Sequence, residues 1–151
     1  MTMTSALRPF LRASIPGIRL TAIQRGGASI EEGAVQLGPR VCWAAELIEF
    51  EHVEVANLTR GSRISGHVRY GREGEAVVAQ PFGTVLMAGD LLRISAYAWL
   101  PDGAINRHVT HLVKVDANNT LIEFRQVPAR SVSLDPASFP PLPAIELVGL
   151  G

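Results

Sequence analysis

The chain has 151 residues, 47% of them hydrophobic, and its 14 basic side chains are balanced by 14 acidic ones. These numbers fit one compact domain, and a net charge of zero provides no basic field that would attract nucleic acid or an anionic membrane surface. The single cysteine, Cys42, cannot form an internal disulfide, and no Cys/His set has the spacing of a zinc site. We therefore expect no nucleic-acid partner and no metal.

The basic residues are unevenly divided, because thirteen are arginines and only Lys114 is a lysine. This leaves almost no candidate for Schiff-base chemistry by a lysine amine. The N-terminal residues are interrupted by Arg8, Pro9 and Arg12, so the apolar stretch of a signal peptide is missing. No apolar run approaches the roughly 18 residues of a membrane span. We expect a cytoplasmic protein that does not bind membranes.

The chain divides into a flexible N-terminal segment over residues 1–16, a β-barrel domain over 17–130 and a proline-rich tail over 131–151. Within the domain, Gly38 to Leu47 has the spacing of a short helix, with proline at its first position. Short alternating segments separated by glycine and asparagine turns predict an all-β barrel or sandwich. The predicted strands cover residues 18–23, 52–58, 63–70, 76–79, 91–99, 108–115 and 121–127.

Two groups of polar residues are weak candidates for chemistry. His108 and His111 are three residues apart, which places them on opposite faces of a strand, so they are poorly arranged to chelate a metal. The paired carboxylates Glu31 and Glu32 precede Gly33 in a predicted loop, where solvated charges are the commoner outcome.

Several segments resemble aspartate 1-decarboxylase, the pyruvoyl-dependent family that makes β-alanine. They occur in the same order as in that family, and the alignment needs no gap from about Glu32 to Arg63. They are Glu32-Gly33-Ala34, the run from Ala44 to Arg63, the Ala88-Gly89-Asp90 turn and Leu100-Pro101-Asp102. The resemblance spans roughly residues 18–127. It implies a mainly β fold, a double-ψ β-barrel with one or two short helices, assembled as a homo-oligomer, usually a tetramer, with active sites between neighbouring subunits.

The resemblance places Ala34 where the family has the serine that becomes the pyruvoyl group. Alanine has no hydroxyl group to attack the preceding carbonyl, so we expect an intact chain without this cofactor. Arg63 matches the arginine that holds the substrate carboxylate. The family's proton-donating tyrosine is replaced by His67, and the threonine before it, which assists self-cleavage, by Gly66.

Other pocket positions also differ from the family pattern. The resemblance places the tyrosine before the glycine at Glu31 and an asparagine at Ala79, and it places an early lysine and histidine near Ile18 and Leu20. These replacements predict a cleft lined by Arg63, His67 and Glu31 and made more apolar by Ile18, Leu20 and Ala79.

An arginine binds an oxyanion, and a nearby histidine can transfer a proton. We therefore expect a cofactor-free small-molecule enzyme of specialised metabolism, a cyclase, an isomerase or a lyase, in which His67 and Glu31 are catalytic. The alternative is a catalytically silent paralogue that binds and regulates a true decarboxylase or a metabolite. The two residues also have a purely structural interpretation, in which Arg63 forms an ordinary ion pair with Glu51 or Glu54 and His67 is a strand histidine with a backbone partner.

Overall fold

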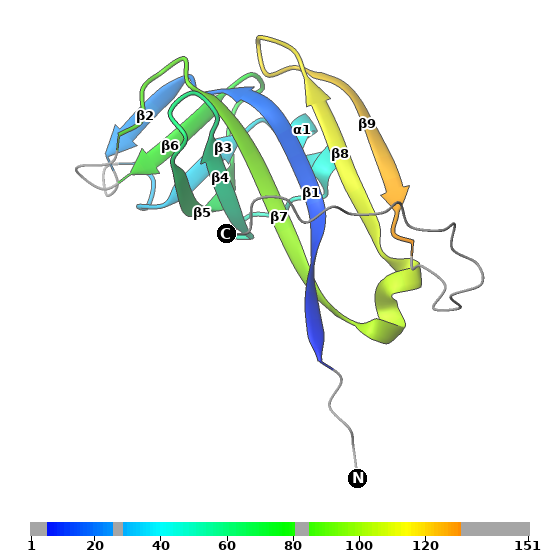
Figure 1. Ribbon diagram of the computed structural model, residues 1–151. Coiled ribbons are helices and arrows are strands. Elements are labelled where there is room, and N and C mark those ends of the chain that lie inside the picture. The colour runs from blue at the N-terminus through cyan, green and yellow to red at the C-terminus, as the bar shows by residue number, and fades with distance from the viewer. Residues whose placement is uncertain (1–5, 26–28, 81–84, 131–151) are drawn as a thin grey trace, which may run out of the picture.

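The computed structural model describes residues 6–25, 29–80 and 85–130 (Figure 1). In this part of the chain nine strands form one sheet in the order β2-β6-β3-β5-β4-β7-β1-β8-β9. The elements are β1 (Leu7–Arg19), β2 (Ala22–Arg25), β3 (Ala34–Leu37), α1 (Pro39–Ala45), β4 (His52–Asn57), β5 (Arg63–Tyr70), β6 (Ala76–Gln80), β7 (Leu91–Pro101), the 3-10 helix η1 (Asp102–Arg107), β8 (Val109–Val115) and β9 (Leu121–Pro128).

The sheet mixes parallel and antiparallel pairs, as the chain crosses between strands that are distant in sequence. The parallel pairs are β2 with β6, β3 with β5 and β1 with β8, and the remaining pairs are antiparallel. The curved sheet surrounds one cluster of buried aliphatic side chains, including Ile15, Leu37, Val55 and Ile94. The mainly β, double-ψ barrel-like fold expected from the sequence is confirmed.

Helix α1 packs beside β8 and β9 and lies within the predicted helical segment. Pro39 occupies its first turn, where a missing N–H costs no hydrogen bond. The helix ends at Glu46, whose left-handed backbone directs its N–H to the carbonyls of Cys42 and Trp43. Because Cys42 and Ala45 are buried, the helix closes this side of the core.

The prediction that residues 1–16 are flexible is wrong from Leu7 onward. Strand β1 pairs with β7 from Leu7 to Arg19, and the two form a long ribbon that extends beyond the rest of the sheet (Figure 1). Pro16 and Gly17 hid this strand in the sequence, but they fall in a register shift between Ile15 and Ile18, where proline and glycine are tolerated.

Two further differences follow from the short length of the elements. The predicted strand over residues 18–23 is divided, because β1 ends at Arg19 and β2 begins at Ala22. Strand β3 has only four residues, too few to show a period, and exists because it is held between β5 and β6. The other predicted strands are present with small changes at their ends.

The proposed tail, 131–151, lies outside the described residues. In the described ranges no helix is long and apolar enough to span a membrane.

Candidate active site

The centre of the site is the junction of β3 and β5. These strands run parallel, and Ala34 is the register partner of His67. The backbone N–H of His67 donates to the Gly33 carbonyl over 2.9 Å, and the N–H of Gly33 donates to the Ala79 carbonyl over 2.7 Å. The Gly33-Ala34 bond is therefore held directly beside the His67 side chain.

Glu31 and His67 form a carboxylate–imidazole pair. Nε2 of His67 lies 2.9 Å from Oε1 of Glu31, and Arg69 Nη1 lies 3.2 Å from the same oxygen. The hydrogen bond from His67, helped by the charge of Arg69, lowers the pKa of Glu31 below its usual value. Since a carboxylate only accepts, we assign the proton to Nε2 of His67, which makes Nδ1 the acceptor nitrogen.

Two side chains outside the predicted set hold this pair in place. The Phe50 ring stacks on the imidazole of His67 at a centroid distance of 5.9 Å, and the Arg69 guanidinium lies 4.6 Å from the centre of the same ring. Arg69 also pairs with Glu49 over 3.1 Å. Arg69 could have been found from the sequence, because residues i and i+2 of a strand share a face. Phe50 lies in a turn and gave no such signal.

A pocket of about 480 Å³ opens beside His67, and a second of about 490 Å³ adjoins it. The two share His52, which is the register partner of His67 on β4. If the β4–β7 register is continued by two residues, Tyr97 lies opposite His52, on the side of β4 that faces away from β5. The first pocket is lined by Gly33, Phe50, His52, Ser65, Gly66 and His67, and the second by Pro9, Glu51, His52, Tyr97 and Trp99.

Arg63 lies on the same face of β5 as His67 but four residues away, which is about 13 Å along a strand. Its side chain is 72% exposed and its Nη1 lies 2.9 Å from Oε1 of Glu54. One of the two ion pairs anticipated for Arg63 is thus present, whereas Glu51 pairs with Arg12 instead. His67 differs from the purely structural interpretation, since its side-chain partner is the Glu31 carboxylate and not a backbone group.

The three apolar residues predicted to line the cleft are buried. Ile18 and Leu20 are 1% exposed and belong to the hydrophobic core. The side chain of Ala79 is fully buried, and this residue reaches the site only through its carbonyl. Their assignment as substrate-contacting residues is therefore corrected, because the inward face of each strand is filled by core packing.

Residues at the Gly33-Ala34 bond do not fit a pyruvoyl group. Ala34 has no hydroxyl group to form the ester that precedes elimination. Gly66 packs so closely on this bond that a Cβ added to it would lie 2.7 Å from the Gly33 carbonyl oxygen and 2.8 Å from Cγ2 of Val35. A threonine at position 66 would therefore collide with the backbone as it stands.

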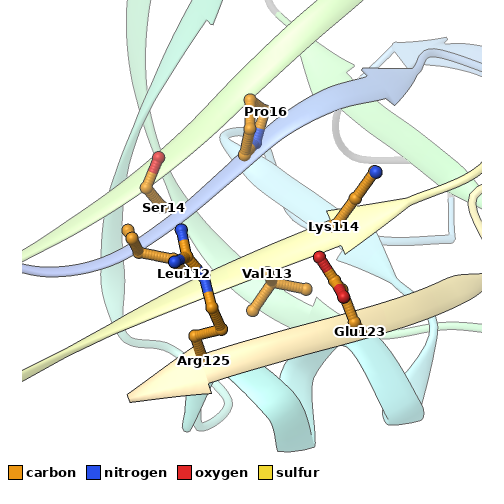
Figure 2. A pocket seen from close by; sticks show the side chains of 7 residues that line it. All are labelled: Ser14, Pro16, Leu112, Val113, Lys114, Glu123 and Arg125. Atoms are coloured by element: carbon orange, nitrogen blue, oxygen red, sulfur yellow. The ribbon is translucent and has the colours of Figure 1, made fainter. Parts of the chain in front are cut away.

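The chain's one lysine lies in a different place. Lys114 borders a pocket of about 380 Å³ between β1, β8 and β9, together with Pro16, Glu123 and Arg125 (Figure 2). It is not among the residues that line the pocket at His67.

The two histidines near β8, His108 just before the strand and His111 on it, have partners outside the candidate site. His108 Nε2 bonds the Leu11 carbonyl at 3.0 Å, and His111 Nε2 lies 3.3 Å from Glu46. Within residues 6–25, 29–80 and 85–130, no group of three or more His, Cys, Asp or Glu side chains could hold a metal ion.

Comparisons with known proteins agree with the resemblance in the sequence. Residues 9–122 match the family model described as aspartate decarboxylase. The aspartate 1-decarboxylase of Hydrogenobaculum sp. (strain Y04AAS1) is 29% identical over 120 residues, covering 79% of this chain and 92% of that protein. That of Sulfurihydrogenibium sp. (strain YO3AOP1) is 31% identical over 124 residues, covering 80% and 89%.

Proposed function

Since the chain belongs to the aspartate decarboxylase family, we propose that it is a member that works without a pyruvoyl group and transfers protons with His67. The observation that carries this proposal is the Glu31–His67 pair beside an open pocket. A carboxylate that holds one ring nitrogen fixes the tautomer and stabilises the imidazolium formed when the other nitrogen takes a proton.

The acceptor nitrogen of His67 faces the small residues of the pocket. A Cβ placed on Gly33 would lie 3.6 Å from Nδ1, and no side chain or backbone group of the described residues donates a hydrogen bond to that nitrogen. Nδ1 is therefore positioned to remove a proton from a carbon next to a carbonyl group, whose oxygen takes up the electron pair. The cyclases, isomerases and lyases that proceed through an enolate begin with such a step.

The adjoining pockets favour an elongated and less polar substrate than aspartate. Beyond His52, the second pocket offers the rings of Tyr97 and Trp99, and the Trp99 side chain is largely exposed. Aromatic side chains supply large apolar contact areas to a ligand. Arg63, with an exposed ion pair that costs little to exchange, is the proposed holder of an anionic substituent that extends from His67 along β5, away from these rings.

The assembly implied by the family resemblance is a homo-oligomer, which we propose to be a tetramer acting in the cytoplasm. Support comes from large apolar side chains outside the proposed pockets that the single chain leaves open on the β1–β7 ribbon, Leu7 and Leu11 on β1. Light scattering on the purified chain measures the mass directly, and a monomer would contradict this part of the proposal.

A solvent-exchange experiment tests the proton transfer. The probe is 6-phenylhex-4-en-2-one in D₂O, with deuterium uptake at the carbon between the carbonyl and the double bond followed by NMR. We expect uptake with the native chain and a loss of about 100-fold or more in His67→Gln, the usual contribution of one acid–base group. Glu31→Gln should give a smaller loss. Uptake that is equal in His67→Gln and the native chain would overturn the proposal.

One observation favours the alternative, a catalytically silent member. The retained arginine, Arg63, is already paired with Glu54 in the chain itself. A silent regulator should bind an active relative, so the chain is mixed with the decarboxylase of Hydrogenobaculum and β-alanine formation is measured. Co-elution with a changed rate supports regulation, whereas an unchanged rate and separate elution exclude it.

A further inference from the structure

His52 is a second imidazole at the same pocket. It begins β4 and is the register partner of His67 on β5. Directly opposed residues of an antiparallel pair have Cβ atoms about 5 Å apart on one face of the sheet. Both side chains line the pocket of about 480 Å³, so both rings face the space that a bound molecule would occupy.

The surroundings of the two histidines differ. His67 is half-buried, bonded to Glu31 and covered by Phe50. The side chain of His52 is exposed and makes no hydrogen bond, ion pair or ring contact with other residues in the described ranges. The imidazole of His67 is therefore oriented by a carboxylate that leaves Nδ1 facing the pocket, whereas both ring nitrogens of His52 are open to water or a ligand.

His52 also lies between the two pockets. It lines the pocket at His67 and the one formed by Tyr97 and Trp99. A substrate that places its aromatic or aliphatic end on these rings and its carbonyl end at His67 must pass His52 on the way. The side chain of His52 can therefore reach substrate atoms that lie a few bonds from the carbon facing His67.

We propose that His52 is the catalytic acid that completes an acid–base pair with His67, and that the site catalyses a 1,3-proton shift in an unsaturated carbonyl compound. This inference rests on the proposed proton transfer at His67. Nδ1 of His67 removes the proton from the carbon between the carbonyl and the double bond. The electron pair moves to form a dienolate, and the His52 imidazolium then protonates the far end of the former double bond.

The two histidines supply everything that this step requires. One C–H bond breaks and one C–H bond forms, the double bond moves into conjugation with the carbonyl, and no oxidant or reductant is consumed. His67 ends protonated and His52 ends neutral, and exchange with water through the open pocket restores both. The substrate class is thus a β,γ-unsaturated ketone, acid or ester with an apolar end.

The test compares His52→Gln and His67→Gln with 6-phenylhex-4-en-2-one as the probe. Two quantities are followed: deuterium uptake at the carbon next to the carbonyl, and formation of the conjugated isomer, 6-phenylhex-3-en-2-one, by its ultraviolet absorbance. In His52→Gln we expect uptake to persist while isomer formation falls by about 100-fold. In His67→Gln both should be lost.

The two variants test the role of His52 and the proton transfer at His67 independently. Isomer formation that persists in His52→Gln overturns the role of His52 and leaves the role of His67 standing. Uptake that persists in His67→Gln overturns the proton transfer itself. Arg72→Gln, an exposed substitution in the turn before β6, is the control and should change neither quantity. A melting temperature for each variant confirms that it is folded, and loss of both activities in a folded His52→Gln also contradicts the inference.

Discussion

The side chain of Asn57 donates a hydrogen bond to the Asp90 carboxylate over 2.9 Å and so joins two turns that lie 33 residues apart. The Asn57 amide oxygen accepts the backbone N–H groups of Thr59 and Arg60, and Asp90 accepts the N–H of Met87. This contact closes the end of β4 against the start of β7 and holds the turn that leads into β5. This turn directly precedes the strand that carries Arg63 and His67.

Replacing Asn57 by alanine should destabilise the fold. The substitution removes the buried hydrogen bond to Asp90 and the acceptor of two backbone N–H groups, so the free energy of unfolding should fall by about 2 kcal/mol. Urea unfolding followed by circular dichroism measures this. Asn118→Ala removes an exposed amide and should change the stability by less than about 0.5 kcal/mol. Equal effects of the two substitutions would contradict the assigned role.

Asp90 predicts how stability depends on pH. The hydrogen bond from Arg60 Nε, followed by that from Asn57, lowers the pKa of Asp90 below its usual value. The folded state therefore binds this proton more weakly than the unfolded state. The stabilisation is complete above the unfolded pKa of about 4 and is lost as the pH falls below it toward the folded pKa. In acid titrations followed by fluorescence, Asp90→Asn should be less stable at neutral pH and lose less stability below about pH 4. A parallel curve would refute this.

The thiol of Cys42 should be inert in the folded protein. Burial in α1, with smaller contributions from the charges of Glu73 and Glu49, raises its pKa to about 12 from the ordinary 9.0. The reactive thiolate is then about a thousandfold scarcer than in the unfolded chain at the same pH. Iodoacetamide labelling read by mass spectrometry should be slow in buffer and rapid in guanidinium chloride. Rapid labelling of the folded chain would show that the helix opens readily.

Gly66→Ala should disturb both stability and the site. The new Cβ would lie 2.7 Å from the Gly33 carbonyl oxygen, which also accepts the N–H of His67. Overpacking of this kind costs about 1–3 kcal/mol. Gly103→Ala is the matched control, because a Cβ there meets no atom within 4 Å. Thermal melting distinguishes them, and an unchanged melting temperature in Gly66→Ala would disprove the close approach.

Restoring a serine alone should not restore self-cleavage. Ala34→Ser supplies a hydroxyl group, but Gly66 leaves no assisting side chain beside it and Glu31 occupies the neighbouring position. Intact mass spectrometry should show one uncleaved chain for both the native protein and Ala34→Ser. Two fragments divided between residues 33 and 34 in the native chain would overturn the pyruvoyl-independent assignment. The same fragments in Ala34→Ser would show that the surrounding machinery has survived.

The alternation of large and polar residues predicted most strands, and the spacing after Pro39 predicted the helix, because each signal lies within a few consecutive residues. The ordered motifs likewise located Ala34 and His67 at one site and Arg63 nearby on the same strand. Ala34 and His67 are 33 positions apart in the chain, and the parallel β3–β5 pair makes them direct partners.

Other features depended on which strands lie beside each other, and no local pattern contains that information. Strand β1 is extended because β7 pairs along its length, although Pro16 and Gly17 argue against a strand locally. The same pairing directs Ile18 into the core and not into the cleft. Nothing in the sequence around His52 indicates that it belongs to the site. The β4–β5 register places it opposite His67, since the period of two in a strand makes the face of a side chain depend on tertiary pairing.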